Sequence, residues 1–332
     1  MRLASVSLAG HPDRICDLVA AGIVDEYLRR DPETRIKCNV SGGRGAIFVT
    51  GEILTSADFD VSHLVQRILG KLGVYEAMEP FIALEPVVSE QVGRWRQACI
   101  EPTLVTGYAT AETDSLMPAP MHLAKNLALM LDEKRKNDPD WFWLGTAGAV
   151  SVLGEGKHLT QAIVEVDHGT QPIEKVRQAI AREFDELGLD QKPKLQINLL
   201  GPSDKQGIEA KVGVSQGHIL AYGQGLPAIV NPAGRDWHGA EVQGVWLARY
   251  WARKILKQTK AQAVMTELLY LPGDNFPSIM TARDERGNDL SKAVNLSREE
   301  IKDLLASWVK PGIMTEAVEA NLVGDGHLPW EA

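Results

Sequence analysis

The chain has 332 residues, of which 44% are hydrophobic and 24% charged, and it carries a formal net charge of −9 at pH 7. This composition is typical of a water-soluble globular protein, and the negative charge argues against nonspecific nucleic-acid binding. Three well-separated cysteines without a Cys-x-x-Cys pair argue against a disulfide framework and against a zinc cluster. We find neither a signal peptide nor a bilayer-length apolar run, and therefore expect a cytoplasmic protein without a membrane partner.

The first long helix is expected directly after Gly10-His11-Pro12-Asp13, because Pro12 suits a first helical position and apolar residues then recur every three to four positions. His11 and Asp13 would sit at the start of this helix. An imidazole donor and a carboxylate at that place suit a phosphorylated ligand with a hard cation. The alternative is a simple N-capping turn, with Asp13 complementing the helix dipole.

Two strands are predicted over 35–40 and 46–53, joined by the glycine-rich loop 41–45. This loop precedes a strand, so it lacks the strand-to-helix context of a phosphate-binding loop and indicates a hairpin. Glu52 lies in an otherwise apolar strand. It either points to solvent on the outer face, which the local pattern favours, or lines a pocket.

Beyond the hairpin the patterns predict a helix over 58–72 and a strand over 81–84. The segment 87–106 has no periodicity, as expected of either an active-site cover or a surface connection. Glu112 and Asp114 follow, two apart in a stretch that we expect to be extended, so both would face the same way and could hold an amine or a metal, or be solvated. Further helices are predicted over 121–135, 173–187, 240–257 and 298–308, and strands over 147–153, 162–167, 194–199, 264–271 and 278–282.

Other groupings of chemical side chains favour structural roles. His238 and Glu241 have a spacing that suits a metal, but a helix-start capping arrangement is the favoured interpretation. The aromatic residues Trp246, Tyr250 and Trp251 recur at helical spacing and indicate core or an interface. Asp167-His168 has no evident nucleophile, which argues against a hydrolase triad. A lowered pKa at Cys16 would be opposed by Asp17.

Several motifs together resemble the S-adenosylmethionine synthetase (methionine adenosyltransferase) family. They are Gly10-His11-Pro12-Asp13, Gly51-Glu52-Ile53 with Thr55-Ser56-Ala57, and Gly107-Tyr108-Ala109-Thr110 through Met117-Pro118-Ala119-Pro120. Later pieces agree in order, namely Ile197-Asn198, Gly234-Arg235-Asp236, Ala248-Arg249-Tyr250, Pro277-Ser278-Ile279-Met280 and Gly326-His327-Leu328-Pro329-Trp330-Glu331. The resemblance is strong before residue 121 and patchy after it.

The resemblance implies an α+β fold of three similar sheet-plus-helix subdomains, with active sites at a subunit interface. We expect an N-terminal subdomain over 1–92, a central one over 107–203, a C-terminal one over 204–332, and a shortened active-site loop over 93–106. The implied assembly is a homodimer or a dimer of dimers. No internal repeat is visible in the sequence, so this threefold similarity depends on the resemblance alone.

The implied reaction is attack by the sulfur of methionine, or of a related amino acid, on C5′ of ATP, with loss of tripolyphosphate. His11 would then be the donor near the 5′ oxygen, and Asp13 and Glu241 would be Mg²⁺ ligands. The implied substrate contacts are Glu52 and Asp114 at the amino acid, Arg235 at the phosphates, and Gln91 (or Gln97) and Ile279. Potassium is doubtful, because Asn39 stands where the family has its potassium-ligating glutamate.

The departures from the family concern cations at the polyphosphate. The family has basic residues at positions where this chain has Pro202-Ser203, the segment 144–150, Gly217-His218 and Gly239. A gapped alignment could bring Asp204 with Lys205, or Lys211, near the site. Loss of cations weakens stabilisation of a polyanionic leaving group. Three hypotheses therefore remain: a methionine adenosyltransferase, an adenosyltransferase with a changed nucleophile, leaving group or direction, and a silent homologue that binds a nucleotide or sulfonium.

Overall fold

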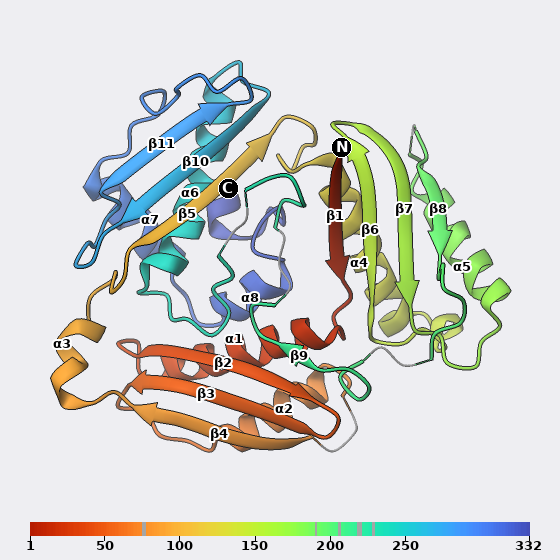
Figure 1. The fold of residues 1–332 in the computed structure, drawn as a ribbon, viewed down its shortest axis with the longest axis horizontal. Helices are drawn as coiled ribbons and strands as arrows, with labels where there is room; N and C mark the ends of the chain where they lie inside the picture. The colour runs from red at the N-terminus through yellow and green to blue at the C-terminus, as the bar shows by residue number, and fades with distance from the viewer. Residues whose placement is uncertain (75–77, 190, 205–206, 218–220, 228–229) are drawn as a thin grey trace.

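The computed structural model describes residues 1–74, 78–189, 191–204, 207–217, 221–227 and 230–332. The described chain forms three β-sheets, each packed with helices, and α1 lies between the sheet of β2 and helix α8 (Figure 1). The expected α+β fold with three sheet-plus-helix units is thereby confirmed.

The elements follow one another along the chain as a mixture of strands and amphipathic helices. The strands are β1 (Arg2–Ser7), β2 (Arg35–Gly43), β3 (Ala46–Leu54), β4 (Glu79–Pro86), β5 (Thr103–Thr110), β6 (Gly148–Glu155), β7 (His158–Val166), β8 (Lys194–Ile197), β9 (Gly213–Val214), β10 (Ala263–Tyr270) and β11 (Ile279–Asp284). The helices are α1 (Pro12–Arg30), α2 (Val61–Lys71), α3 (Val92–Trp95), α4 (Ala119–Asn137), α5 (Ile173–Glu186), α6 (Ala240–Gln258), α7 (Arg298–Trp308) and α8 (Ile313–Glu319), with short 3-10 turns at Ser89–Gln91, Pro139–Trp141 and Pro329–Glu331.

Each sheet takes one strand from a distant part of the chain. The sheet orders are β1-β6-β7-β8, β11-β10-β5 and β4-β3-β2-β9. Thus β1 pairs antiparallel with β6, β5 pairs antiparallel with β10, and the two-residue β9 pairs with the end of β2. The expected subdomain boundaries remain a prediction. The exchange of strands means that the three segments are tied together by backbone hydrogen bonds.

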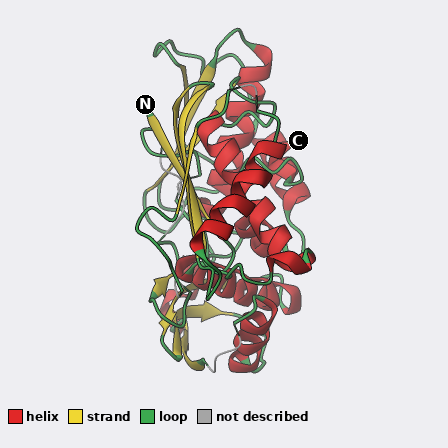
Figure 2. Ribbon diagram, turned by 90° about the vertical axis from the view of Figure 1, so that its right-hand side faces the viewer, coloured by secondary structure: helices red, strands yellow, loops and turns green. Residues whose placement is uncertain are grey.

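Helices cover one face of each sheet. Helix α4 packs on β1 and β6, α6 packs on β5 and β10, and α1 packs on β2. Turned by 90°, the upper part of the molecule shows a strand layer on one side and a helix layer on the other (Figure 2). Because a sheet with one covered face alternates inward and outward residues, the outward faces carry the side chains that remain available for ligands or partners.

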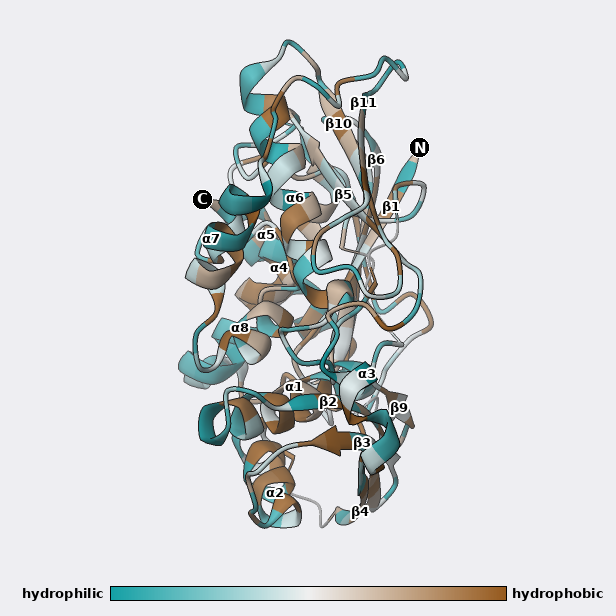
Figure 3. Cartoon of the chain, turned by 90° about the vertical axis from the view of Figure 1, so that its left-hand side faces the viewer, coloured by the Kyte–Doolittle hydropathy of each residue, from teal (hydrophilic) through white to brown (hydrophobic). Residues whose placement is uncertain are grey.

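The hairpin β2–β3 follows this alternation closely. Ile36, Cys38 and Val40 are buried under α1, whereas Lys37 and Asn39 point to the other face. The strand β3 is largely hydrophobic (Figure 3), and its outward Phe48 remains 46% exposed. Phe48 stacks on Phe81 of β4 with ring centroids 4.9 Å apart. An uncovered, partly aromatic sheet face is therefore part of this unit.

Several elements were not predicted from the sequence. They are the short helix α3 and the elements β1, β5, β9 and α8; the last four gain their stability from partners far away in the chain. The segment 111–117, expected to be extended, forms turns instead, so Glu112 and Asp114 do not face the same way as strand residues would. No helix among the described residues has the length and apolar character needed to span a bilayer.

Candidate functional site

The start of α1 holds His11 and Asp13. His11 is the N-cap residue, and its Nδ1 accepts a hydrogen bond from the backbone N–H of Asp13 at 3.3 Å. An accepting Nδ1 carries no proton, so the proton of the neutral ring resides on Nε2. The Asp13 carboxylate accepts from Val214 N–H at 2.9 Å, and its other oxygen lies 4.0 Å from His11 Nδ1. Both side chains are partly exposed, so a ligand can reach them.

Residues 213–217, which we call the strap, hold this helix start in place. Gly213 lies so close to Pro12 that a Cβ would overlap the Pro12 carbonyl. Gln216 adopts the left-handed conformation, with φ of 68°, and its N–H donates to Asp17 Oδ1 at 2.6 Å. Its side-chain amide donates to Ala233 O at 2.8 Å. The strap thus connects the start of α1 to the segment before α6.

Asp17 is a buried carboxylate beneath the strap. It is 1% exposed and accepts hydrogen bonds from Gln216 N–H and from the Asn231 side-chain amide. Burial raises the pKa of Asp17 to about 6, although these hydrogen bonds act in the opposite direction. The same burial raises the pKa of Cys16 to about 12, so no thiolate is favoured at the helix start.

A cavity of about 340 Å³ lies next to the strap. Its polar lining includes Gln216 and Asn231 together with Lys37, Arg235 and Glu241, and the segment 100–104 forms another wall. Lys37 Nζ lies 3.7 Å from Glu241 Oε1. The cavity therefore combines two cations with two carboxylates, Glu101 and Glu241, an arrangement suited to a ligand that carries phosphate and a divalent cation.

Arg235 is engaged by neighbouring backbone and amide oxygens. Its guanidinium donates to Cys38 O at 2.9 Å, to Gly234 O at 3.3 Å and to Asn39 Oδ1 at 3.4 Å. These contacts fix the guanidinium group of Arg235 at the cavity. They also occupy donors that a free arginine would offer to phosphate.

The other substrate-binding candidates lie outside this group. Glu52 is exposed on the outward face of β3, directly across from Lys37 in the hairpin. Ile279 is the first residue of β11 and is 53% exposed. It pairs with Leu269 of β10, and Leu269 pairs in turn with Leu104 of β5, a residue that lines the cavity. Gln91 is exposed in the 3-10 turn before α3. Asp114 is exposed in the turn after β5.

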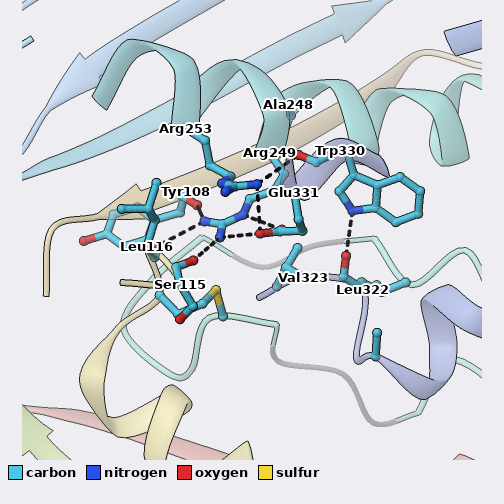
Figure 4. Close-up of polar contacts among 12 residues, drawn as sticks. Tyr108, Ser115, Leu116, Ala248, Arg249, Arg253, Leu322, Val323, Trp330 and Glu331 are labelled. Carbon is cyan, nitrogen blue, oxygen red and sulfur yellow. Dashed lines mark hydrogen bonds and ion pairs between the residues drawn. The ribbon is translucent and has the colours of Figure 1, made fainter. Parts of the chain in front are cut away.

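The turn that carries Asp114 is fixed from inside the molecule. Arg249 of α6 donates to the carbonyl oxygens of Tyr108, Ser115 and Leu116 and forms an ion pair with Glu331, with 2.8 Å between Nε and Oε1 (Figure 4). Arg249 and Glu331 are 0% and 3% exposed, respectively. Glu112, the second carboxylate of this turn, pairs with Arg2 at 2.6 Å and accepts from Ala119 N–H. It is thus a structural residue.

The replacement cations suggested by sequence are not brought to the cavity by any described contact. Lys205 and His218 lie outside the described residues. Lys211 and Asp204 are exposed, and neither lines the cavity. Arg14, next to Asp13, turns to α8 and donates to Glu319 O at 2.7 Å.

The remaining groupings have structural surroundings, but the capping arrangement expected for His238 and Glu241 was wrong, because the N-cap residue of α6 is Gly239 and no side chain among the described residues caps this helix start. His238 Nε2 lies 2.9 Å from Pro32 O. The backbone N–H of His238 donates a hydrogen bond to the side chain of Asp236, just before the start of α6. Trp246 is fully buried and stacks on Trp330 at 4.5 Å. Ser203 donates its hydroxyl to Asp167, while its backbone N–H donates to His168 Nε2, so the imidazole is not placed as a base for the hydroxyl.

Among the described residues no three histidine, cysteine, aspartate or glutamate side chains gather into a metal cage. Mg²⁺ does not require one, because it is commonly held by one or two carboxylates together with water and substrate phosphates. Asp13 keeps one carboxylate oxygen that accepts no hydrogen bond from the strap, and Glu241 shares its carboxylate with a single lysine. These carboxylates fit Mg²⁺ bound together with a phosphorylated ligand.

Sequence reasoning missed Lys37, Asp17, Gln216 and Asn231. For Lys37 a signal existed, because the alternation of β2 places it on the same face as Asn39 and beside Glu52. The other residues are brought together by the strap, whose two-residue strand has no periodic pattern to reveal it.

Similar proteins are known in sequence and in fold. A model described as the N-terminal domain of S-adenosylmethionine synthetase matches residues 3–93, and one described as the central domain matches residues 97–201. The S-adenosylmethionine synthase of Aquifex aeolicus is 25% identical over 100% of this chain and 96% of its own length. S-adenosylmethionine synthase 1 of Rhodospirillum rubrum is 28% identical over 82% of this chain and 78% of its own. An unusual S-adenosylmethionine synthetase from Campylobacter jejuni shares the fold, with a TM-score of 0.82, 20% identity, and coverage of 100% and 97% of the two chains.

Proposed function

Because the chain belongs to the S-adenosylmethionine synthetase family, we propose that it transfers the adenosyl group of ATP to the sulfur of methionine. A C–S bond forms at C5′ of the ribose, the C5′–O bond breaks, and the bonding electrons leave with tripolyphosphate. The observation that carries the proposal is the strap, which holds Asp13, two residues from His11, at one end and reaches the cavity of Lys37, Arg235 and Glu241 at the other.

In this proposal His11 acts at the breaking bond. With Nδ1 accepting from the backbone, the Nε2–H is directed as a donor, and it would stabilise charge that develops on the departing 5′ oxygen. Arg235 and Lys37 would bind the phosphates. Mg²⁺, held by Asp13 and Glu241, would neutralise phosphate charge when bound. Glu52 and Asp114 would hold the methionine ammonium in line for attack.

The partly exposed faces of the sheets support a homodimer. Phe48, Phe81 and Ile279 are each about half exposed on outward sheet faces, and Glu52 lies on the same face as the two phenylalanines. We infer that two copies meet across these faces, so that Glu52 and Ile279 contribute to a site completed by the second subunit.

One observation favours a second candidate, adenosyl transfer with a different leaving group. The cavity offers two cations among its described residues, of which Lys37 pairs with Glu241 and Arg235 is bonded to carbonyl oxygens. A tripolyphosphate carries more charge than these groups neutralise. A shorter leaving group would need fewer cations.

The test is product identification. The protein is incubated with ATP, Mg²⁺ and methionine, and S-adenosylmethionine is followed by mass spectrometry together with phosphate, pyrophosphate and tripolyphosphate. We expect the sulfonium product in wild type, strong loss in His11→Asn, and normal rates in His63→Asn, an exposed histidine of α2. Asparagine keeps a good N-cap, so the helix start is preserved. Phosphate release without a sulfonium would support changed chemistry, and nucleotide binding with neither product would support a silent homologue.

A further inference from the structure

A second cavity, of about 480 Å³, shares a wall with the first. The segment 235–241 contributes Arg235 and Glu241 to the first cavity, and Trp237 and His238 to the second. The other walls of the second cavity come from the start of β2, the segment 96–98, the loop before β11 and helix α7. None of its lining residues belongs to the proposed transfer site.

The polar lining of this second cavity is basic. Arg35, Arg96 and Lys302 all line it, and no carboxylate does. Within the described part of the chain none of these three cations forms an ion pair at 4.0 Å or less. Arg35 Nε is buried without a hydrogen-bond partner, whereas its Nη1 donates to Glu33 O at 3.0 Å. In a chain with a net charge of −9, this local excess of unpaired positive charge indicates a site for an anion.

Nearby acidic groups of the described chain form no ion pair with these cations, although the charges of Asp236 and Glu33 act on Arg35 from a distance. Asp236 lies behind the cavity, but its two carboxylate oxygens accept from the N–H groups of Ile36 and His238. Burial raises the pKa of Asp236. The backbone carbonyl oxygen of Glu33 accepts a hydrogen bond from Arg35, whereas the Glu33 carboxylate acts on Arg35 only from a distance. The cavity thus keeps donors that a phosphate would satisfy.

The remaining lining is apolar and partly aromatic. Trp237 and Phe276 contribute rings, and Leu305, Ala306 and Val309 contribute aliphatic surface from α7 and the residue after it. Asn275 and Gln243 supply amides that can bond ring nitrogens or hydroxyls. A volume of this size holds a ligand with one phosphate and a flat ring system.

We propose that the second cavity is a separate binding site for a small aromatic phosphate ester of about nucleoside monophosphate size. Arg96 and Lys302 bind the phosphate together with Arg35, and the ring packs between Phe276 and the aliphatic side chains of α7. The site differs from the transfer site in its lining, and its occupancy does not depend on adenosyl transfer.

The experiment is calorimetric titration of the whole protein with phenyl phosphate, an aromatic monoester without an adenosyl group. We expect Arg96→Gln and Lys302→Gln each to weaken binding about tenfold or more, as loss of one charge-assisted hydrogen bond does. Arg94→Gln is the matched control, because Arg94 is an exposed arginine of α3, two residues before Arg96, and does not line the cavity. It should change affinity less than twofold. Inorganic phosphate should bind at least fivefold more weakly than phenyl phosphate, because it lacks the ring.

The proposal is overturned by undetectable binding to wild type, by equal losses in Arg94→Gln and Arg96→Gln, or by equal affinities for phenyl phosphate and inorganic phosphate. Arg235→Gln separates the two cavities. Retained binding in this variant supports the second cavity, whereas lost binding places the probe in the first cavity and refutes the proposal. Normal S-adenosylmethionine formation without phenyl phosphate binding would likewise refute this site and leave the proposed function intact.

Discussion

At the residue scale, the most heavily buried charged contact is the pair Arg249–Glu331. The pair ties the last residues of the chain to the turn that carries Asp114 (Figure 4). Glu331 also pairs with Arg253, at 3.3 Å, so its removal leaves two buried arginines without their carboxylate, which costs far more than loss of a surface pair. We therefore expect Glu331→Gln to lower the free energy of unfolding by about 3 to 5 kcal/mol, measured by urea denaturation.

The matched control for this change is Glu316→Gln. Glu316 pairs with Lys310 at 2.6 Å, but both side chains are nearly half exposed. An exposed pair contributes about 0 to 1 kcal/mol, so this variant should remain close to wild type. Similar losses in the two variants would contradict the assigned role of the buried pair.

The buried carboxyl group of Asp17 makes the free energy of unfolding depend on pH. Its pKa of about 6 in the folded state lies above the unfolded value of 3.8, so the folded state holds the proton more tightly. Stability must then fall as the pH rises from about 4 to about 6 and level off above that, by an amount on the order of 3 kcal/mol. Asp17→Asn should remove this slope. Urea unfolding midpoints of both proteins between pH 4 and 7, without Mg²⁺, measure this pH dependence. The same slope in Asp17→Asn and in wild type would contradict the raised pKa of Asp17.

At the element scale, the strap depends on a glycine. Any Cβ at Gly213 would overlap the Pro12 carbonyl, so Gly213→Ala must push β9 away from the start of α1. Val214 N–H would then lose its bond to Asp13. We expect a folded protein with strongly reduced adenosyl transfer, whereas Gly70→Ala, in an open position of α2, should be neutral or slightly stabilising. Full activity of Gly213→Ala would show that the strap does not position Asp13.

The elements also show which parts of the fold a sequence can reveal. The spacing of apolar residues predicted α7 with its observed bounds and α6 to within one residue, because α7 buries one face and α6 buries most of its circumference against the core. Strands β1, β5 and β9 were missed because their partners lie far away in the chain, and a local pattern contains no information on such pairing. The turns at 111–117 were missed for a similar reason, because Arg249 fixes them from α6.

The candidate site was predictable only in part. His11 and Asp13 could be placed at a helix start from Pro12 and the following periodicity. The contacts of Arg235 with Cys38, and of Asp17 with Gln216 and Asn231, join segments that are distant in sequence. Their convergence required the three-dimensional structure.

At the scale of the whole molecule, the uncovered sheet faces lead to a prediction on assembly. Phe81 stacks on Phe48 at the outward face of β3 and β4, so Phe81→Glu would place a charge in the proposed dimer contact. We expect this variant to shift to monomer in analytical ultracentrifugation. Phe142→Glu, at a site that is 84% exposed after a 3-10 turn, should stay dimeric. A wild-type monomer, or a dimer unaffected by Phe81→Glu, would contradict the proposed interface.

We propose that His11, held at the start of α1, assists departure of the polyphosphate from C5′. The decisive experiment is a single-turnover measurement of S-adenosylmethionine formation from ATP, Mg²⁺ and methionine, with ATP affinity measured on the same samples. We expect His11→Asn to slow transfer by about 10²- to 10³-fold and to change ATP affinity only a few-fold, because the bond to the departing oxygen strengthens in the transition state. An equal transfer rate in wild type and His11→Asn would contradict it.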